Sequence, residues 1–152
     1  MTTKTHEDAL SPGDYEALAD LRYALRRFTE FSNAEVSNLG MTPQQHQALL
    51  AIKGLPPEKE MTIGMLAERL LIAPHSATEL VNRLSDAGYI ERLSSKDDGR
   101  RQIVRLMDKA DGILAKLSGA HLHEIREMAP ELMQALRILQ DRRKLEKIAW
   151  MA

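Results

Sequence analysis

Along most of the chain, apolar residues recur every three or four positions, which is the spacing of an amphipathic α-helix. In the first such stretch the apolar positions are Leu18, Leu21, Leu25 and Phe28. The segment Ser11–Asp14 precedes them and combines a capping box with a proline at the first helical position. We therefore predict a helix that begins near Ser11 and ends between Asn38 and Gly40.

A second helix is predicted from the same start signal. Thr42 to Gln45 repeats the hydroxyl residue, the proline and the glutamine of a capping box. Gly54 is placed to end this helix, and its buried face is predicted to contain Ala48, Leu49 and Ile52. The segment 55–60 holds two adjacent prolines, so we expect a loop there.

The middle of the chain contains two short helical patterns with a tight break at Leu71 to Ala73. Thr62 is expected to cap the first helix, which ends at Leu70, and Pro74 opens the second. Gly88 then supplies a C-terminal cap, since a left-handed residue is least costly as glycine. This arrangement is typical of a helix-turn-helix.

A β-hairpin is predicted to follow. Tyr89–Leu93 and Gln102–Leu106 have the composition of short strands, and the polar segment Ser94–Gly99 joins them as a turn. Two further helices are expected after it, one from Asp108 and a last one that begins at Pro130 and reaches about residue 150. The predicted fold class is therefore mainly α with a small β-hairpin wing (α+β), a winged helix-turn-helix with helices on both sides.

Composition narrows the function classes. The chain of 152 residues has no cysteine. This excludes disulfides, zinc–thiolate sites and thiol-based redox sensing. No apolar run approaches the roughly 20 residues of a membrane span, and the polar N-terminus is unlike a signal peptide. We therefore expect a cytoplasmic protein with no membrane partner.

The formal net charge is −1, which by itself argues against a nucleic-acid partner. The distribution of charge argues the other way. From Arg92 to Arg105 the chain has five basic residues and two acids. A local surplus of this kind on a protruding loop is sufficient for contact with phosphates.

The helix from Pro74 to Ala87 presents a polar face suited to reading base edges. Asparagine can pair with adenine, and arginine with guanine or phosphate, in a major groove. The candidate DNA-binding residues of this helix are His75, Ser76, Thr78, Glu79, Asn82 and Arg83. An ordinary solvated helix face is the alternative interpretation.

The hairpin favours DNA binding because it follows directly on this helix. An arginine at a loop tip fits a minor groove, where it responds to groove width and negative potential. The candidate wing residues are Ser95, Lys96, Asp98, Arg100 and Arg101. A solubilising β-turn is the alternative.

Two segments resemble the multiple antibiotic resistance regulator (MarR) family: residues 76–92, SATELVNRLSDAGYIER, and residues 98–106, DGRRQIVRL. The resemblance extends over nearly the whole chain, because the flanking helices also fall in the family's order. It implies a triangular dimer that is built by the N- and C-terminal helices and has a winged helix at each lower corner.

The resemblance also assigns roles to single positions. The residues that match the family's reader helix are Ser76, Thr78, Asn82 and Arg83. Asp98 and Arg100 match a pair in which the acid orients an arginine toward the groove. At Met107 the family usually has a threonine that caps the next helix, and we expect Asp108 to provide this cap instead.

The outer helices contain more apolar residues than one small core can bury, and the apolar end 148–152 would be an exposed patch on a monomer. We therefore expect a homodimer that binds a pseudo-palindromic operator in double-stranded DNA; intramolecular packing or a frayed end is the alternative. The expected parts are a flexible tail (1–10), N-terminal dimerisation and support helices (11–60), the DNA-binding winged helix (61–107) and C-terminal dimerisation helices (108–152).

The family resemblance further implies a small-molecule pocket, near which we place Tyr23, Arg26 and His46; ordinary surface or core-edge positions are the alternative for all three. The predicted function is a dimeric, sequence-specific DNA-binding transcription regulator. We expect a repressor that a small aromatic or phenolic ligand releases from its operator.

Three other function classes differ in how well the sequence supports them. An enzyme is disfavoured because no nucleophile–base pair, phosphate-binding glycine loop or catalytic carboxylate pair is found, so we expect no catalytic residue and no cofactor. A metal-responsive regulator is an alternative, although His123 with Glu127 supplies at most half a site and we predict no metal ligands. A winged helix that binds proteins without DNA is the other, and the acidic pI keeps it open.

Overall fold

The computed structural model describes residues 9–151, with the side chains of residues 9–140. The chain forms two compact units: unit 1 contains the residues up to 31 and those from 122 onward, and unit 2 contains residues 32–121. Most of the predicted N-terminal tail and the side chains of the apolar end 148–152 lie outside the described residues.

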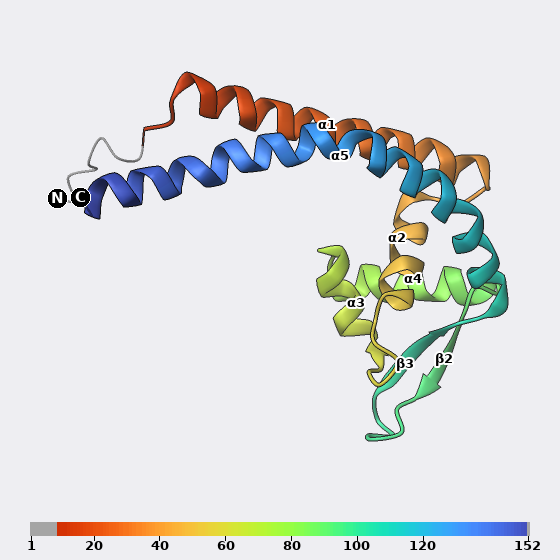
Figure 1. Ribbon diagram of the computed structural model, residues 1–152. Coiled ribbons are helices and arrows are strands. Elements are labelled where there is room, and N and C mark those ends of the chain that lie inside the picture. Colours follow the sequence, from red (N-terminus) through yellow and green to blue (C-terminus); the bar gives the residue numbers. More distant parts are fainter. Residues whose placement is uncertain (1–8, 152) are drawn as a thin grey trace. The chain divides into compact units, whose positions relative to one another are not determined.

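Unit 1 is a pair of helices that run side by side in opposite directions (Figure 1). α1 spans Pro12–Asn38 and α5 spans Asp108–Met151, and each passes from one unit into the other. Within unit 1, an ion pair joins Arg27 Nη1 to Glu131 Oε2 at 3.9 Å. Ala17, Ala24 and Ala135 are among its buried residues, and such short side chains let two helix backbones approach closely.

The start of α1 is as predicted. The Ser11 N–H donates to Asp14 Oδ2 at 3.0 Å, and the Asp14 N–H donates to Ser11 Oγ at 3.2 Å. Two of the N–H groups that a helix start leaves unpaired are satisfied in this way. The helix ends at Asn38, within the predicted range.

The prediction of a separate last helix beginning at Pro130 is wrong. Pro130 lies inside α5, which has 44 residues in all. A proline removes one backbone hydrogen bond and disturbs the preceding turn, but it does not prevent the helix from continuing after it. The buried residues Met128 and Ala135 on either side of Pro130 pack in unit 1, and this packing favours helix on both sides.

Unit 2 is the winged helix with its supporting helices. Its complete elements are α2 (Pro43–Lys53), β1 (Met61–Thr62), α3 (Ile63–Leu70), α4 (Pro74–Asp86), β2 (Ile90–Ser94) and β3 (Gln102–Leu106). The three strands form an antiparallel sheet in the order β1-β3-β2. The predicted hairpin is confirmed, and β1 is an addition, since a strand of two residues gives no alternating pattern to detect.

The capping signals of α2 and α3 act as expected. Thr42 Oγ1 accepts from the Gln45 N–H at 3.1 Å, while Gln45 Oε1 accepts from the Thr42 N–H at 3.0 Å. Thr62 Oγ1 accepts from the Met65 N–H at 3.1 Å. α5 begins at Asp108 as predicted, but Asp108 does not provide the expected cap. Met107 therefore occupies the N-cap position, and Asp108 lies in the first turn.

Two residues with positive φ turn the chain at the ends of α3 and α4. Leu71 (φ 55°) ends α3 in the left-handed conformation, and Gly88 (φ 82°) follows α4. Gly88 adopts this conformation without a steric penalty, whereas Leu71 does so at a cost and with 92% of its surface exposed.

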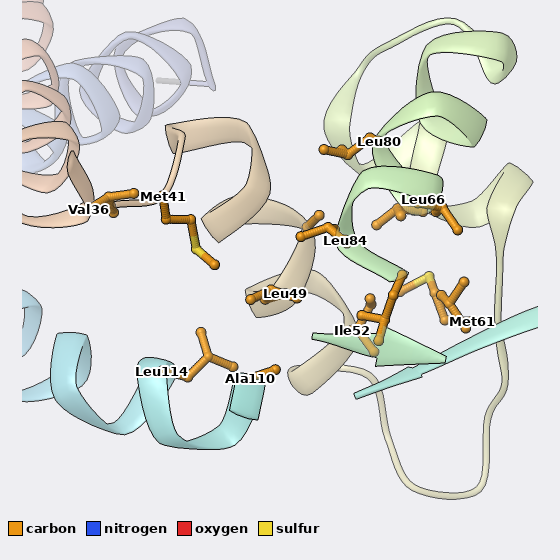
Figure 2. Close-up of a cluster of buried hydrophobic side chains, with 14 of the residues drawn as sticks. Val36, Met41, Leu49, Ile52, Met61, Leu66, Leu80, Leu84, Ala110 and Leu114 are labelled. Atoms are coloured by element: carbon orange, nitrogen blue, oxygen red, sulfur yellow. The ribbon is translucent and has the colours of Figure 1, made fainter. Parts of the chain in front are cut away.

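The core of unit 2 lies where α2, α3, α4, the sheet and the start of α5 meet (Figure 2). Leu49, Leu66, Leu84 and Ile90 are almost completely buried there. The buried face of α4 contains the four residues expected from its pattern, which are Ala77, Leu80, Val81 and Leu84. The core therefore fixes α4 with its opposite face outward. Among the described residues, no helix has the length and apolar character needed to cross a bilayer.

Candidate nucleic-acid interface

The outward face of α4 is polar, and most of its predicted DNA-binding side chains are accessible. His75, Glu79, Asn82 and Arg83 are exposed. Ser76 and Thr78 are half-buried, and the Thr78 hydroxyl donates to the Pro74 carbonyl at 3.1 Å. The helix start is held by Pro74 and has no side-chain cap, because its N-cap residue is Ala73. The first backbone N–H groups of α4 are thus available to an anion.

The wing is the segment Ser94–Arg101 between β2 and β3, and Ser95 supports it from inside. Ser95 is buried, and its hydroxyl donates to Glu60 Oε2 at 2.6 Å. Ser95 Oγ also accepts from the N–H groups of Asp97 and Asp98 at 3.2 and 3.4 Å. The structure therefore places Ser95 at the base of the wing, away from the surface expected for a DNA contact.

Glu60 anchors the wing from the loop before β1. Besides the bond from Ser95, its carboxylate accepts from the Lys96 N–H at 3.3 Å. The hydrogen bond from Ser95, and then that from Lys96, hold the pKa of Glu60 below its ordinary value. A carboxylate that stays ionised here keeps both bonds at neutral pH.

The tip of the wing exposes the remaining predicted residues, which are Lys96, Asp98, Arg100 and Arg101. Asp98 Oδ1 accepts from the backbone N–H of Arg100 at 3.0 Å, and the Asp98 carbonyl accepts from the Arg101 N–H at 3.0 Å. Asp98 thus fixes the backbone of the turn at Arg100 and Arg101.

Arg92 connects the reader helix to the wing strands. Its guanidinium donates to Asn82 Oδ1 on α4 and to Gln102 Oε1 on β3. Arg105, one strand away, is paired with Glu91 instead. The outward face of α4 and the strands of the wing are therefore within reach of one side chain.

The three residues proposed for a ligand pocket are divided between the two units. Tyr23 and Arg26 are exposed on α1 in unit 1, where the Arg27 guanidinium lies 5.6 Å from the centre of the Tyr23 ring. His46 is buried in unit 2, with its ring centre 5.2 Å from that of His121. Burial lowers the pKa of His46, and the neighbouring His121 lowers it further.

Comparisons with known proteins agree with this geometry. A family model described as the MarR family matches residues 39–101. A transcriptional activator of exopolysaccharide II synthesis, ExpG from Rhizobium meliloti, is 32% identical over 109 residues, which are 70% of this chain and 54% of that protein. The chain thus spans about half the length of this curated relative.

Solved structures share the fold. The MarR-family regulator AbsC from Streptomyces coelicolor superposes with a TM-score of 0.68 at 16% identity, over 94% of this chain and 96% of that one. A mutant of MepR from S. aureus, bound to an oligodeoxyribonucleotide, gives a TM-score of 0.61 at 14% identity, over 91% and 98% of the two chains.

The chain belongs to the MarR family. The matched segment runs from the end of α1 to the wing and includes α3, α4 and the candidate DNA-binding residues. The predicted family and the predicted winged-helix fold are both confirmed. MarR-family proteins are transcription regulators, so the prediction that the chain is not an enzyme is confirmed as well.

Two residues of the candidate interface, Glu60 and Arg92, were not predicted from the sequence. Glu60 gave no local signal, because only the pairing of β1 with β3 brings it to the wing. Arg92 did give one: it lies two positions after buried Ile90 on β2 and so shares the inward face of that strand. A charged residue at such a position needs polar partners, and it could have been read as a link to the neighbouring helix.

Proposed function

We propose that this chain is a transcription regulator that binds specific sites in duplex DNA as a homodimer. In each copy, α4 would enter a major groove while the wing reaches the adjacent minor groove. The winged helix (61–107) would be the DNA-binding region, and the helices before and after it would support it and form the dimer. A DNA partner also leads us to place the protein in the cytoplasm.

The observation that supports DNA binding most directly is the junction at Arg92. Through its bonds to Asn82 and Gln102, the reader face of α4 and the wing strands form one surface. The uncapped start of α4 adds N–H donors for a phosphate, and Arg100 and Arg101 add charge at the wing tip. The local chemistry therefore suits DNA, although the net charge of the chain is −1.

The proposal of a homodimer rests on unit 1. Ten of the fourteen large hydrophobic residues that the described part of the chain exposes lie in this unit, among them Tyr15, Leu25, Met133 and Leu136. An exposed apolar surface of this kind is typical of an interface. A two-fold dimer would present two α4 helices to half-sites about one helical turn apart.

The test is the salt dependence of binding to duplex fragments selected from a random pool. Phosphate contacts release counterions, so the logarithm of the affinity should fall linearly with the logarithm of the salt concentration. Arg100→Ala should weaken binding to all sequences and reduce this slope by about 1, whereas Asn82→Ala should relax the preference at one position. Arg22→Ala is the matched control, because it removes an equal charge from the exposed surface of α1.

An affinity that does not change with salt would contradict DNA binding and favour the alternative, a winged helix that binds another protein. A chain that sediments as a monomer while binding DNA tightly would contradict the dimer alone. The two parts of the proposal therefore fail separately.

We propose repression as the regulatory sense, because a dimer bound over two half-sites blocks access to the DNA beneath it. A reporter gene placed behind a selected binding site should be expressed less when the protein is present. The curated relative ExpG is named an activator, and higher expression from this reporter would assign the same sense to this chain.

Release by a small aromatic or phenolic ligand is the second step of the proposed function. Such a ligand must prefer the DNA-free arrangement of the dimer, because it shifts the bound population only by its differential affinity. Titration of aromatic acids into the protein–DNA complex, followed by fluorescence anisotropy of labelled DNA, should show release. A panel that neither binds nor releases would contradict this step.

A further inference from the structure

Arg92 links the reader helix to the wing strands, but the function proposed so far gives it no part in choosing a base. It lies on β2 opposite Val104 of β3, whose side chain is buried. Because side chains alternate along a strand, Arg92 shares the inward face of β2 with buried Ile90. An arginine in such a position stays charged and therefore needs acceptors nearby.

Two neutral amides supply these acceptors. The guanidinium of Arg92 donates to Asn82 Oδ1 and to Gln102 Oε1. Within the described part of the chain, no carboxylate pairs with Arg92, and its Nε is buried without an acceptor. The position of this guanidinium therefore depends on the two amide oxygens.

The same two bonds determine how each amide is oriented. A guanidinium group can only donate hydrogen bonds, so the amide atom that faces it must be the oxygen. The –NH₂ groups of Asn82 and Gln102 are then left for partners outside, and both side chains are exposed. Asn82 consequently directs its two N–H donors outward, while its Oδ1 faces Arg92 and has one of its two lone pairs occupied.

We propose that Arg92 is a positioning residue that makes Asn82 a hydrogen-bond donor in the major groove and so selects guanine opposite it. Guanine presents two acceptors there, N7 and O6. Adenine presents one acceptor and one donor, and its bidentate pairing with asparagine needs Oδ1 to face the base beside the –NH₂ group, whereas the bond from Arg92 turns Oδ1 toward β2. This inference rests on the proposed function, because it specifies which base the reader helix selects.

The test compares the sequences that the full-length protein and its variants select from a random duplex pool. Arg92→Met keeps an unbranched apolar chain but removes the donors, so Asn82 becomes free to pair with adenine. We expect the wild type to select guanine at one position of each half-site, and Arg92→Met to shift the relative affinity there toward adenine by about tenfold. Asn82→Ala should lose the preference at the same position.

Arg105→Met is the matched control. It removes an arginine from the neighbouring strand whose partner is Glu91 and not a residue of α4. Its selected sequence should be that of the wild type at the position read by Asn82. If Arg92→Met weakens binding to all sequences equally and leaves the preference unchanged, Arg92 acts as a simple cation and the proposal is overturned. Wild-type selection of adenine at the Asn82 position would overturn it too.

A second measurement needs no DNA and does not depend on whether Arg92→Met folds. Asn82→Asp and Gln102→Glu each place a carboxylate where the amide oxygen meets the guanidinium, so each should raise the midpoint of thermal unfolding of the dimer. Neither variant raising it would show that the amides do not hold Arg92, and the proposal fails. If both raise it while the wild type retains no duplex even at low salt, the arrangement at Arg92 stands and the proposed function fails instead.

Discussion

Unit 2 and unit 1 differ in how far they bury their large apolar residues. All of the largest fully buried side chains in the described part of the chain, Leu49, Leu66 and Leu84 among them, lie in unit 2. In unit 1 the buried hydrophobic residues are three alanines and Met128, while larger residues such as Tyr23 and Leu136 are exposed. Unit 2 thus contains its own core, whereas unit 1 presents apolar surface outward.

This difference indicates that the two units have different roles, association for unit 1 and support of α4 and the wing for unit 2. A helix pair that buries mainly alanine gains little free energy from its own packing, since apolar burial contributes about 25 cal/mol per Å². Its exposed apolar residues are therefore available to a second copy. The winged helix, in contrast, can hold α4 and the wing in place without a partner. The predictions below test this contrast.

The largest effect is expected in the core of unit 2. Leu84→Ala removes a fully buried side chain from the inner face of α4 and should lower the free energy of unfolding by about 3 kcal/mol. Leu50→Ala is the matched control, because Leu50 is 53% exposed on α2. Urea unfolding followed by circular dichroism measures both variants. Equal losses for the two would show that unit 2 has no self-contained core.

The next effect is expected at the surface of unit 1. Leu136→Glu puts a charge on an exposed apolar position of α5 and should weaken the dimer by about 2 kcal/mol, which is the cost of losing a strong interface contact. Sedimentation at several concentrations should show monomers, with helical content retained. Gln134→Glu, which adds the same charge at an exposed polar position nearby, should leave the association unchanged. A dimer that tolerates Leu136→Glu would place the interface elsewhere.

A smaller effect, on stability and not on association, is expected at Leu71. This is the most exposed large apolar side chain of the described residues. Its left-handed backbone, with φ 55°, is strained for leucine. Leu71→Gly should therefore raise the free energy of unfolding by about 1 kcal/mol, while Leu71→Ala, which keeps the strain, should change it little. Thermal unfolding compares the two. If alanine and glycine stabilise equally, the gain does not come from the backbone.

The smallest effect concerns pH. Burial, and then His121, lower the pKa of His46 from the ordinary value of 6.5. Above pH 6.5 both folded and unfolded chains keep this histidine neutral, and stability does not depend on it. As the pH falls below 6.5, the unfolded chain takes up a proton that the folded chain resists, so stability is lost. His46→Gln should make unfolding midpoints fall less between pH 7.5 and pH 5.5; an unchanged slope would contradict this.

Local signals in the sequence were sufficient for most elements. Three helix starts were predicted from short capping patterns, because Ser11, Thr42 and Thr62 satisfy N–H groups only three residues away. The inner face of α4 follows from its apolar spacing. Pro130 was misinterpreted because the local cost of a proline is visible in sequence, whereas the packing around it is not.

What the amino-acid order alone determined here is therefore the identity of the family, the sequence of elements and the exposed face of the reader helix. Only the tertiary structure decided which polar side chains form hydrogen bonds inside the protein. Ser95 is buried against Glu60, and Asn82 Oδ1 accepts a hydrogen bond from Arg92. The reason is physical: a hydrogen bond between residues 35 positions apart, as between Ser95 and Glu60, exists only once strand pairing has brought its two ends together.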